Sequence, residues 1–280
     1  MKRPEDLIVL LDGGEKPPLF CVHSVSGFAT FYRLMTKPLE NLVYGINAID
    51  VTLSELPLRT VEDMAERYVG ELLEIEPHGP YYLCGFSMGG LLAYEMAVQL
   101  IALGKPVEFL GLIDTFIASD PIHLHTTGLE RQNWLTFLNI VFGGVDESYY
   151  DEHHVFWDMT NSQRISFIAE RENWKNRAAP TYINNAWVGR FHKIFIELLV
   201  TSTKYRVPKA NVNLHYFSTG GKEADEAIEI LKGRAIGGVK TMQVNGTHFD
   251  LFNSINAEFL GQTIAHAINT VKKRSRSECS

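Results

Sequence analysis

The sequence predicts an α/β fold in which a mostly parallel sheet is covered by helices on both faces. Short apolar runs alternate with segments whose apolar residues recur every three or four positions, as expected for alternating strands and helices. The runs at 43–46, 81–86 and 107–113 are almost entirely apolar. Strands of a parallel sheet have this composition because helices bury both of their faces.

Glycine and proline mark most of the boundaries between these elements. In chain order we expect strands at 7–11, 19–23, 43–46, 81–86, 107–113, 212–219 and 239–244. We expect helices at 31–39, 60–75, 88–103 and 224–231, with a closing helix through 255–268. Thr60 is placed to cap the second of these helices, and Gly104 follows the third.

Composition and charge exclude several classes of protein. The 280 residues carry a net charge of −7, whereas a nucleic-acid-binding protein would present a basic face. No apolar stretch approaches the ~20 residues that span a bilayer, and Met1-Lys2-Arg3 leads into polar residues rather than an apolar signal sequence. We therefore expect a cytoplasmic protein whose partners are neither nucleic acids nor membranes.

A Gly-x-Ser-x-Gly sequence joins the strand at 81–86 to the helix after it. Gly85 and Gly89 lack Cβ atoms, so the backbone can turn sharply and expose Ser87. At such a turn the serine can meet a general base, and the Met88 N–H can face an oxyanion. The motif alone can arise by chance as a structural turn, but the flanking strand and helix favour a nucleophilic serine. Cys84 is a poorer candidate because it lies within the strand.

Two further residues fit a catalytic triad with Ser87. Asp114 follows the strand at 107–113, and the carboxyl ends of parallel strands share one edge of the sheet. His248 lies in the loop after the last expected strand, which gives the chain order Ser, Asp, His. His215, within a strand, and His266, within a helix, are poorer bases. The alternative for Asp114 is a cap on the turn before the next residue.

The loop 24–27 is expected to supply a second oxyanion donor. In hydrolases with a nucleophile elbow this donor comes from a loop after an early strand, and the Val25 N–H is the candidate here. His23 ends that strand. We expect it to hold the loop by hydrogen bonding rather than to act as the base.

Between residues 116 and 207 the strand–helix alternation stops. This segment contains helical patterns with many aromatic residues, so we predict a helical lid inserted between two parts of a core, 1–115 and 208–271. The aromatic residues fit an apolar substrate, and they fit the lid's own packing equally well. Four histidines in this segment lack acidic companions, so no metal site is expected: His123, His125, His153 and His154. The charged end, 272–280, is expected to be disordered.

Four segments, in order, resemble the thioesterase domains that end fatty-acid, polyketide and nonribosomal-peptide synthases, which have the α/β-hydrolase fold. They are 18–23 with Gly27, 79–97, 112–114, and 246–252. The resemblance implies Ser87 as nucleophile, His248 as base, Asp114 as the residue that orients it, and Val25 and Met88 as oxyanion donors. It favours Asp114 over Glu223 and Asp225, which stand one strand later, where many α/β-hydrolases keep the acid. Ser24 departs from the family, which often has proline there.

The resemblance also implies a function. Such domains release an acyl, polyketide or peptidyl chain from the phosphopantetheine of a carrier protein, by hydrolysis or cyclisation through an acyl-serine, and need no cofactor of their own. Carriers of this family are usually acidic, so we hypothesise that a basic group of residues docks the carrier: Arg190, Lys193, Lys204, Arg206 and Lys209. An ordinary solvated helix face is the alternative. Competing functions are a free-standing editing thioesterase, a carboxylesterase or lipase acting on small oxygen esters, and a non-catalytic binding module.

Overall fold

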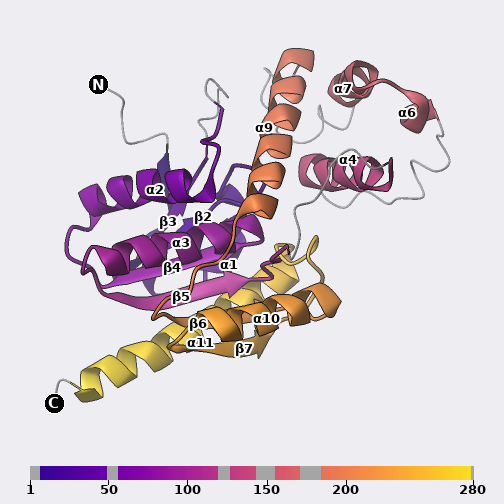
Figure 1. The fold of residues 1–280 in the computed structure, drawn as a ribbon. Coiled ribbons are helices and arrows are strands. Elements are labelled where there is room, and N and C mark those ends of the chain that lie inside the picture. Colours follow the sequence, from indigo (N-terminus) through magenta and orange to yellow (C-terminus); the bar gives the residue numbers. More distant parts are fainter. Residues whose placement is uncertain (1–6, 49–55, 119–126, 143–154, 171–183, 279–280) are drawn as a thin grey trace.

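A seven-stranded sheet forms the centre of the protein (Figure 1). The computed structural model describes residues 7–48, 56–118, 127–142, 155–170 and 184–278. The strand order is β1-β3-β2-β4-β5-β6-β7. Only β1 runs antiparallel to its neighbour, β3, and every other pairing is parallel. The strands are β1 (Ile8–Asp12), β2 (Glu15–Val22), β3 (Asn41–Ile46), β4 (Tyr81–Phe86), β5 (Val107–Ile113), β6 (Asn213–Ser218) and β7 (Gly238–Gln243). The predicted mostly parallel α/β fold is confirmed.

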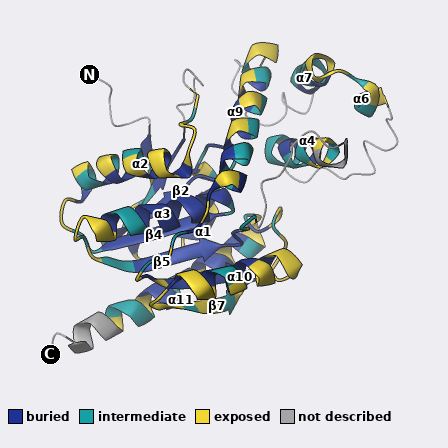
Figure 2. Cartoon of the chain, viewed as in Figure 1, coloured by how far each residue is buried: buried dark blue, intermediate teal, exposed yellow. Residues whose placement is uncertain are grey.

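Helices bury each face of the sheet in a separate apolar core. One core combines α2 (Val61–Ile75), α3 (Met88–Ala102) and α10 (Lys222–Arg234) with one face of the strands. The other combines α1 (Arg33–Thr36) and α11 (Ser254–Glu278) with the opposite face. The central strands are consequently buried along most of their length (Figure 2).

The helix starts follow from local chemistry. The Thr60 side chain accepts a hydrogen bond from the Asp63 N–H at 3.0 Å, which satisfies a first-turn donor of α2 as the sequence predicts. The helix at 31–39 is shorter than expected. A 3₁₀ turn at Thr30–Tyr32 leads into α1, which ends at Thr36, two residues before Pro38, whose missing N–H cannot continue the helical hydrogen bonding.

The C-terminal helix is longer than expected. α11 continues to Glu278, whereas the sequence analysis expects disorder from residue 272 onward. Lysine, arginine and glutamate are good helix formers, and extending an existing helix avoids the cost of nucleation. Basic side chains near a helix C-terminus are also favoured by the helix dipole.

The segment between β5 and β6 is helical in its described parts. It contains α4 (Thr127–Phe142), α6 (Val155–Asp158), α7 (Asn161–Glu170) and α9 (Asn185–Lys204). Figure 1 shows α4, α6 and α7 grouped beside α9, away from the sheet. The boundaries of the lid, 116–207, and of the two core parts stay a prediction. The four histidines read as surface residues, His123, His125, His153 and His154, lie outside the described residues.

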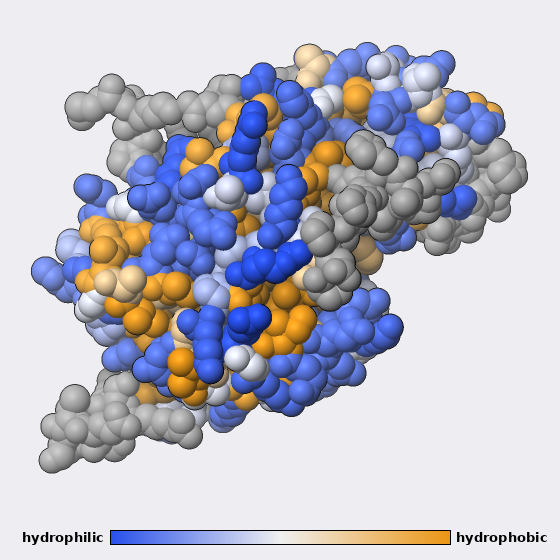
Figure 3. Space-filling model, in the orientation of Figure 1, coloured by the Kyte–Doolittle hydropathy of each residue, from blue (hydrophilic) through white to orange (hydrophobic). Residues whose placement is uncertain are grey.

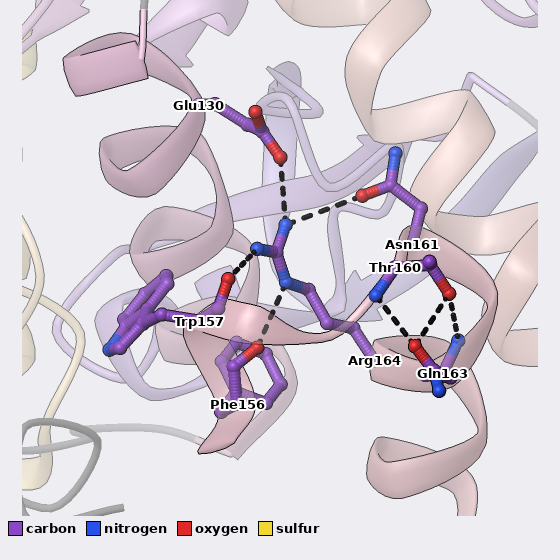
Figure 4. A network of polar contacts seen from close by, with 7 residues as sticks. All are labelled: Glu130, Phe156, Trp157, Thr160, Asn161, Gln163 and Arg164. Carbon is purple, nitrogen blue, oxygen red and sulfur yellow. Dashed lines mark hydrogen bonds and ion pairs between the residues drawn. The ribbon is translucent and has the colours of Figure 1, made fainter. Parts of the chain in front are cut away.

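A buried arginine organises the packing of these helices (Figure 4). Arg164 pairs with Glu130 at 2.7 Å and donates to the carbonyl oxygens of Phe156 and Trp157 at 3.1 and 2.7 Å. Its guanidinium group also lies over the ring of Trp134, 5.4 Å from the ring centre. Part of the aromatic content of the segment therefore serves the segment's own core, which was one of the two alternatives.

Two tyrosines tie this segment to the helix that follows Ser87. Tyr94 on α3 donates to the Pro208 carbonyl at 2.9 Å, and Tyr205 donates to the buried Glu95 carboxylate on α3 at 2.7 Å. The chain leaving α9 is thereby fixed to α3. In the described ranges, no helix is both long enough and apolar enough to cross a bilayer.

Candidate active site

Ser87 stands at a strained turn between β4 and α3. Its φ of +54° lies in a region that residues with a side chain rarely adopt. The Ser87 N–H donates to the Ile113 carbonyl at 2.9 Å, which ties the turn to the end of β5. A Cβ at Gly85 would collide with the backbone of Gly89, so the strand and helix approach as closely as they do only with glycine. The elbow predicted from the sequence is present.

Asp114 is the buried partner of His248. The carboxylate is fully buried at the end of β5, and Oδ2 accepts a hydrogen bond from His248 Nδ1 at 2.8 Å. Oδ1 accepts from the backbone N–H and the hydroxyl of Thr219 at 3.1 and 2.8 Å. Burial alone would raise the pKa of Asp114, but the hydrogen bonds from His248 and Thr219 together outweigh it and lower the pKa. Asp114 is therefore an ionised carboxylate with both oxygens occupied.

This contact favours Asp114 over the two alternative acids. Glu223 and Asp225, the alternatives one strand later, are exposed in the first turn of α10. His248 bonds to Asp114 instead, so its Nδ1 is the donor and Nε2 is left to accept a proton.

The loop that carries His248 is shaped mainly by its own polar groups. The Thr247 N–H donates to the Asp250 carboxylate at 2.6 Å, and Asn256 donates to the Asp250 carbonyl at 3.1 Å. Gly246 provides the positive φ, +95°, with which the loop begins. The Asp114 carboxylate is the hydrogen-bond partner that links the imidazole to the sheet.

A cavity of about 390 Å³ brings Ser87 and His248 to a common surface. Its wall comes from the sheet edge, from the loop after β2, and from α4 and α9, and most of the lining is apolar and aromatic. The aromatic lining residues are Phe28, Phe31, Phe86, Trp187, Phe191, Phe249 and Phe252. Polar side chains are fewer, and Thr136 and Asn139 on α4 are among them. The cavity suits an apolar group attached to a reactive carbonyl.

The two predicted oxyanion donors come from the loop after β2 and from the start of α3. Val25 lines the cavity, and Met88 is the first residue of α3, where an N–H has no partner within the helix. Among the described backbone hydrogen bonds of loops and turns, neither N–H is a donor. Their role as an oxyanion hole stays a prediction.

His23 is buried and holds the loop after β2. Its Nδ1 lies 2.7 Å from the Ser24 carbonyl oxygen and its Nε2 lies 2.8 Å from the Tyr68 hydroxyl. Burial lowers the pKa of His23 to about 4, so the ring is neutral, with Nδ1 donating to Ser24 and Nε2 accepting from Tyr68. Ser24 also accepts from the Gly27 N–H at 2.9 Å. The expectation that His23 holds this loop is confirmed.

Sequence reasoning missed Thr219 and Tyr68. Thr219 directly follows β6, which pairs with β5. This pairing places Thr219 beside Asp114, but the residue types alone do not predict the register of two strands. Tyr68 occupies an apolar position of α2, where an aromatic residue is explained by packing alone.

Part of the chain is similar in sequence to known thioesterase domains. Residues 17–145 match the family described as the thioesterase domain. Enterobactin synthase component F of Escherichia coli O157:H7 is 40% identical over 132 residues, 46% of this chain and 9% of that protein. A dimodular nonribosomal peptide synthase of Bacillus subtilis is 38% identical over 112 residues, 39% of this chain and 5% of that protein. This chain thus spans less than a tenth of the length of these two relatives.

Solved structures show the same fold. A four-domain nonribosomal peptide synthetase bound to AMP and glycine matches with a TM-score of 0.75 at 18% identity, over 94% of this chain and 20% of that chain. The NocB thioesterase domain from the nocardicin cluster matches with a TM-score of 0.64 at 20% identity, over 94% of this chain and 99% of that domain. The α/β-hydrolase type of fold is therefore shared.

We predict that the Thr219 hydroxyl is needed to orient the Asp114 carboxylate. Thr219→Val removes a hydrogen bond to a charged, buried oxygen, which is worth about 1.5–3 kcal/mol. We expect the second-order rate at which a small fluorophosphonate labels Ser87 to fall about tenfold. Thr219→Ser, which keeps the hydroxyl, should react at close to the wild-type rate. Equal rates for the valine and serine variants would contradict this role.

We also predict that acid destabilises the protein between pH 6.5 and 4. The pKa of His23 is about 4 in the folded protein and about 6.5 in the unfolded chain. The unfolded chain binds more protons in this window, so the free energy of unfolding should fall as pH falls, by about 3 kcal/mol at most from this residue. The pKa of His192 is also lowered to about 4, by burial and by the nearby Arg164, so His192 adds to the same trend.

Urea unfolding at a series of pH values measures this trend. His23→Gln replaces the titrating ring with an amide that can donate and accept, so its stability should depend less steeply on pH than that of the wild type. An unchanged slope in that variant would show that His23 does not carry the effect.

Proposed function

We propose that this protein is a thioesterase domain similar to those of nonribosomal peptide and polyketide synthases, and that it releases an acyl, polyketide or peptidyl chain from a carrier protein. The acyl, polyketide or peptidyl group would be attached to the carrier as a thioester of phosphopantetheine. The phosphopantetheine belongs to the carrier and is no cofactor of this protein. A cytoplasmic location forms part of the proposal.

The observation that carries this proposal is the Asp114–His248 hydrogen bond at the wall of the cavity that Ser87 also lines. Ser87 follows β4, Asp114 follows β5, and His248 lies in the loop after β7, so all three lie at the same edge of the parallel strands. This is the arrangement that activates an alcohol as a nucleophile.

In the first step His248 Nε2 takes the proton of the Ser87 hydroxyl while Ser87 Oγ attacks the thioester carbonyl carbon. The ionised Asp114 holds the imidazole and stabilises its protonated form. The N–H groups of Val25 and Met88 are placed to stabilise the negative charge on the carbonyl oxygen. The C–S bond then breaks, the thiolate takes the proton from His248, and the acyl group remains on Ser87.

In the second step a nucleophile attacks the acyl-serine ester. His248 takes a proton from water, or from a hydroxyl or amine of the acyl chain itself, and returns it to Ser87 Oγ as the ester bond breaks. Water gives a free acid, and an internal nucleophile gives a ring. The apolar lining of the cavity favours a route in which water is displaced by the acyl chain.

Docking of the carrier is the second part of the proposal. Arg190, Lys193 and Lys204 recur along one side of α9 and are exposed, and Arg206 and Lys209 follow the helix. Figure 3 shows hydrophilic side chains along this part of the surface. On a protein of net charge −7, such a local basic group can attract an acidic partner and raise the rate of encounter.

We predict that Ser87→Ala abolishes release. Carrier proteins loaded with a panel of acyl and peptidyl chains are incubated with either form, and the products are identified by mass spectrometry. The wild type should release free acids or rings, and the alanine variant should release nothing above background. Release by the variant at the wild-type rate would refute the mechanism. Turnover of small oxygen esters without turnover of carrier-bound chains would favour a carboxylesterase.

Reversing the charge at the proposed docking residues should affect only carrier-bound substrates. We expect Arg190→Glu combined with Lys193→Glu to lower kcat/KM for a carrier-bound acyl group about tenfold at low salt and to spare a small thioester of the same acyl group. Lys222→Glu with Lys232→Glu on α10 makes the same change of charge elsewhere and serves as the control. Equal losses on both substrates, or in both double variants, would remove the docking hypothesis.

A further inference from the structure

Two phenylalanine rings flank the imidazole of His248. The ring of Phe86 lies 4.5 Å from the imidazole, centre to centre, and the ring of Phe116 lies 4.6 Å from it. The planes are inclined to that of the imidazole by only 32° and 29°. Among the described aromatic pairs, Phe86 and Phe116 make no contact with each other. Each therefore makes its own contact with the imidazole, and we call this pair the aromatic clamp.

The clamp supplies a restraint that the hydrogen bond to Asp114 lacks. A single bond at Nδ1 fixes one atom of the ring, and it leaves the plane of the imidazole free to tilt about that atom. Contacts with two rings inclined by only about 30° to the imidazole restrict this tilt, and with it the direction in which Nε2 points. Direction matters because proton transfer from Ser87 requires Nε2 to lie within hydrogen-bonding distance and in line.

Each half of the clamp is placed by the sheet. Phe86 is the last residue of β4, and its N–H donates to the Tyr32 hydroxyl at 2.7 Å. Phe116 follows Asp114 and Thr115, and the Thr115 carbonyl accepts from the Tyr216 hydroxyl on β6 at 2.8 Å. Phe86 thus ends β4, Phe116 lies three residues beyond the end of the neighbouring parallel strand β5, and His248 comes from a separate loop. The clamp aligns the loop residue with the strand that presents Ser87.

Phe116 is the half whose only described ring contact is with the imidazole. Phe86 packs on Phe31 and Phe252 as well, so replacing it would disturb the apolar core. Phe116 is 39% accessible and belongs to neither apolar core, so it can be replaced with little effect on the core. Its described ring contact is the one with His248.

We infer that Phe116 is a positioning residue for the base, and that it also stabilises the imidazolium formed when His248 takes the proton of Ser87. The face of an aromatic ring is negative and attracts a cation that lies over it. This inference rests on the proposed function, because it concerns the same proton transfer, but it assigns a role to a residue outside the triad and the oxyanion donors. It predicts that the flat aromatic face, rather than the bulk, is what matters.

Three variants separate these properties. Phe116→Tyr keeps the ring, Phe116→Leu keeps most of the volume without a ring, and Phe116→Ala removes both. With a small acyl thioester we expect kcat to fall about tenfold for leucine and further for alanine, with KM changed less than twofold, and to stay within about twofold of wild type for tyrosine. The rate of Ser87 labelling by a fluorophosphonate should follow the same order, because that reaction also needs His248 as base.

Thermal unfolding shows whether each variant is folded, and the labelling reaction tests the clamp independently of the proposed function. All three variants should unfold within a few degrees of the wild type, since the residue is exposed. If leucine equals tyrosine in kcat and labelling, or if only KM changes, the clamp has no positioning role. If the wild type is labelled at Ser87 but turns over no thioester, the proposed function fails, and the labelling series still tests the clamp.

Discussion

One hydrogen bond links the two halves of the candidate site. It joins Asp114 at the end of β5 to His248 in a loop 134 residues later in the chain. This bond depends on two further strands of the sheet. β6 and β7 pair in parallel beside β5, which brings the loop after β7 to the Asp114 carboxylate. Burial would penalise the charge on Asp114, and the donors from His248 and Thr219 offset that penalty.

Strain in the backbone is concentrated at two neighbouring turns. Ser87 and Asp114 both have positive φ, +54° and +42°, and both follow strands that pair with each other. A Cβ at Gly90 would collide with the Thr115 side chain, so the first turn of α3 packs directly on the residue after Asp114 only because Gly90 has no side chain. The Ser87 N–H and the Asp114 N–H donate to the ends of adjacent strands, which holds both turns in these conformations. These two strained turns direct the side chains of Ser87 and Asp114 to the same edge of the sheet.

Much of this could be predicted from the sequence, and the exceptions have physical reasons. The elbow, the position of Asp114 and the loop of His248 follow from motifs and from the order of strands, which are local properties of the chain. Thr219 and Phe116 act through contacts that depend on register and on loop conformation, and residue type alone does not report these. The helical conformation of residues 272–278 was not predicted, because their charge was taken as a sign of disorder, whereas lysine and arginine also favour helix extension. The lid boundaries, the oxyanion donors and the docking surface stay predictions.

The central claim is that Ser87 is acylated with His248 as its base. Peptide mass spectrometry of the protein, quenched shortly after mixing with a carrier-bound acyl thioester, tests it most directly. The account predicts the mass of the acyl group on Ser87 in the wild type and its absence at the same time point from His248→Ala. An acyl group on another residue such as Cys84, or equal acylation of Ser87 in the two proteins, would contradict it.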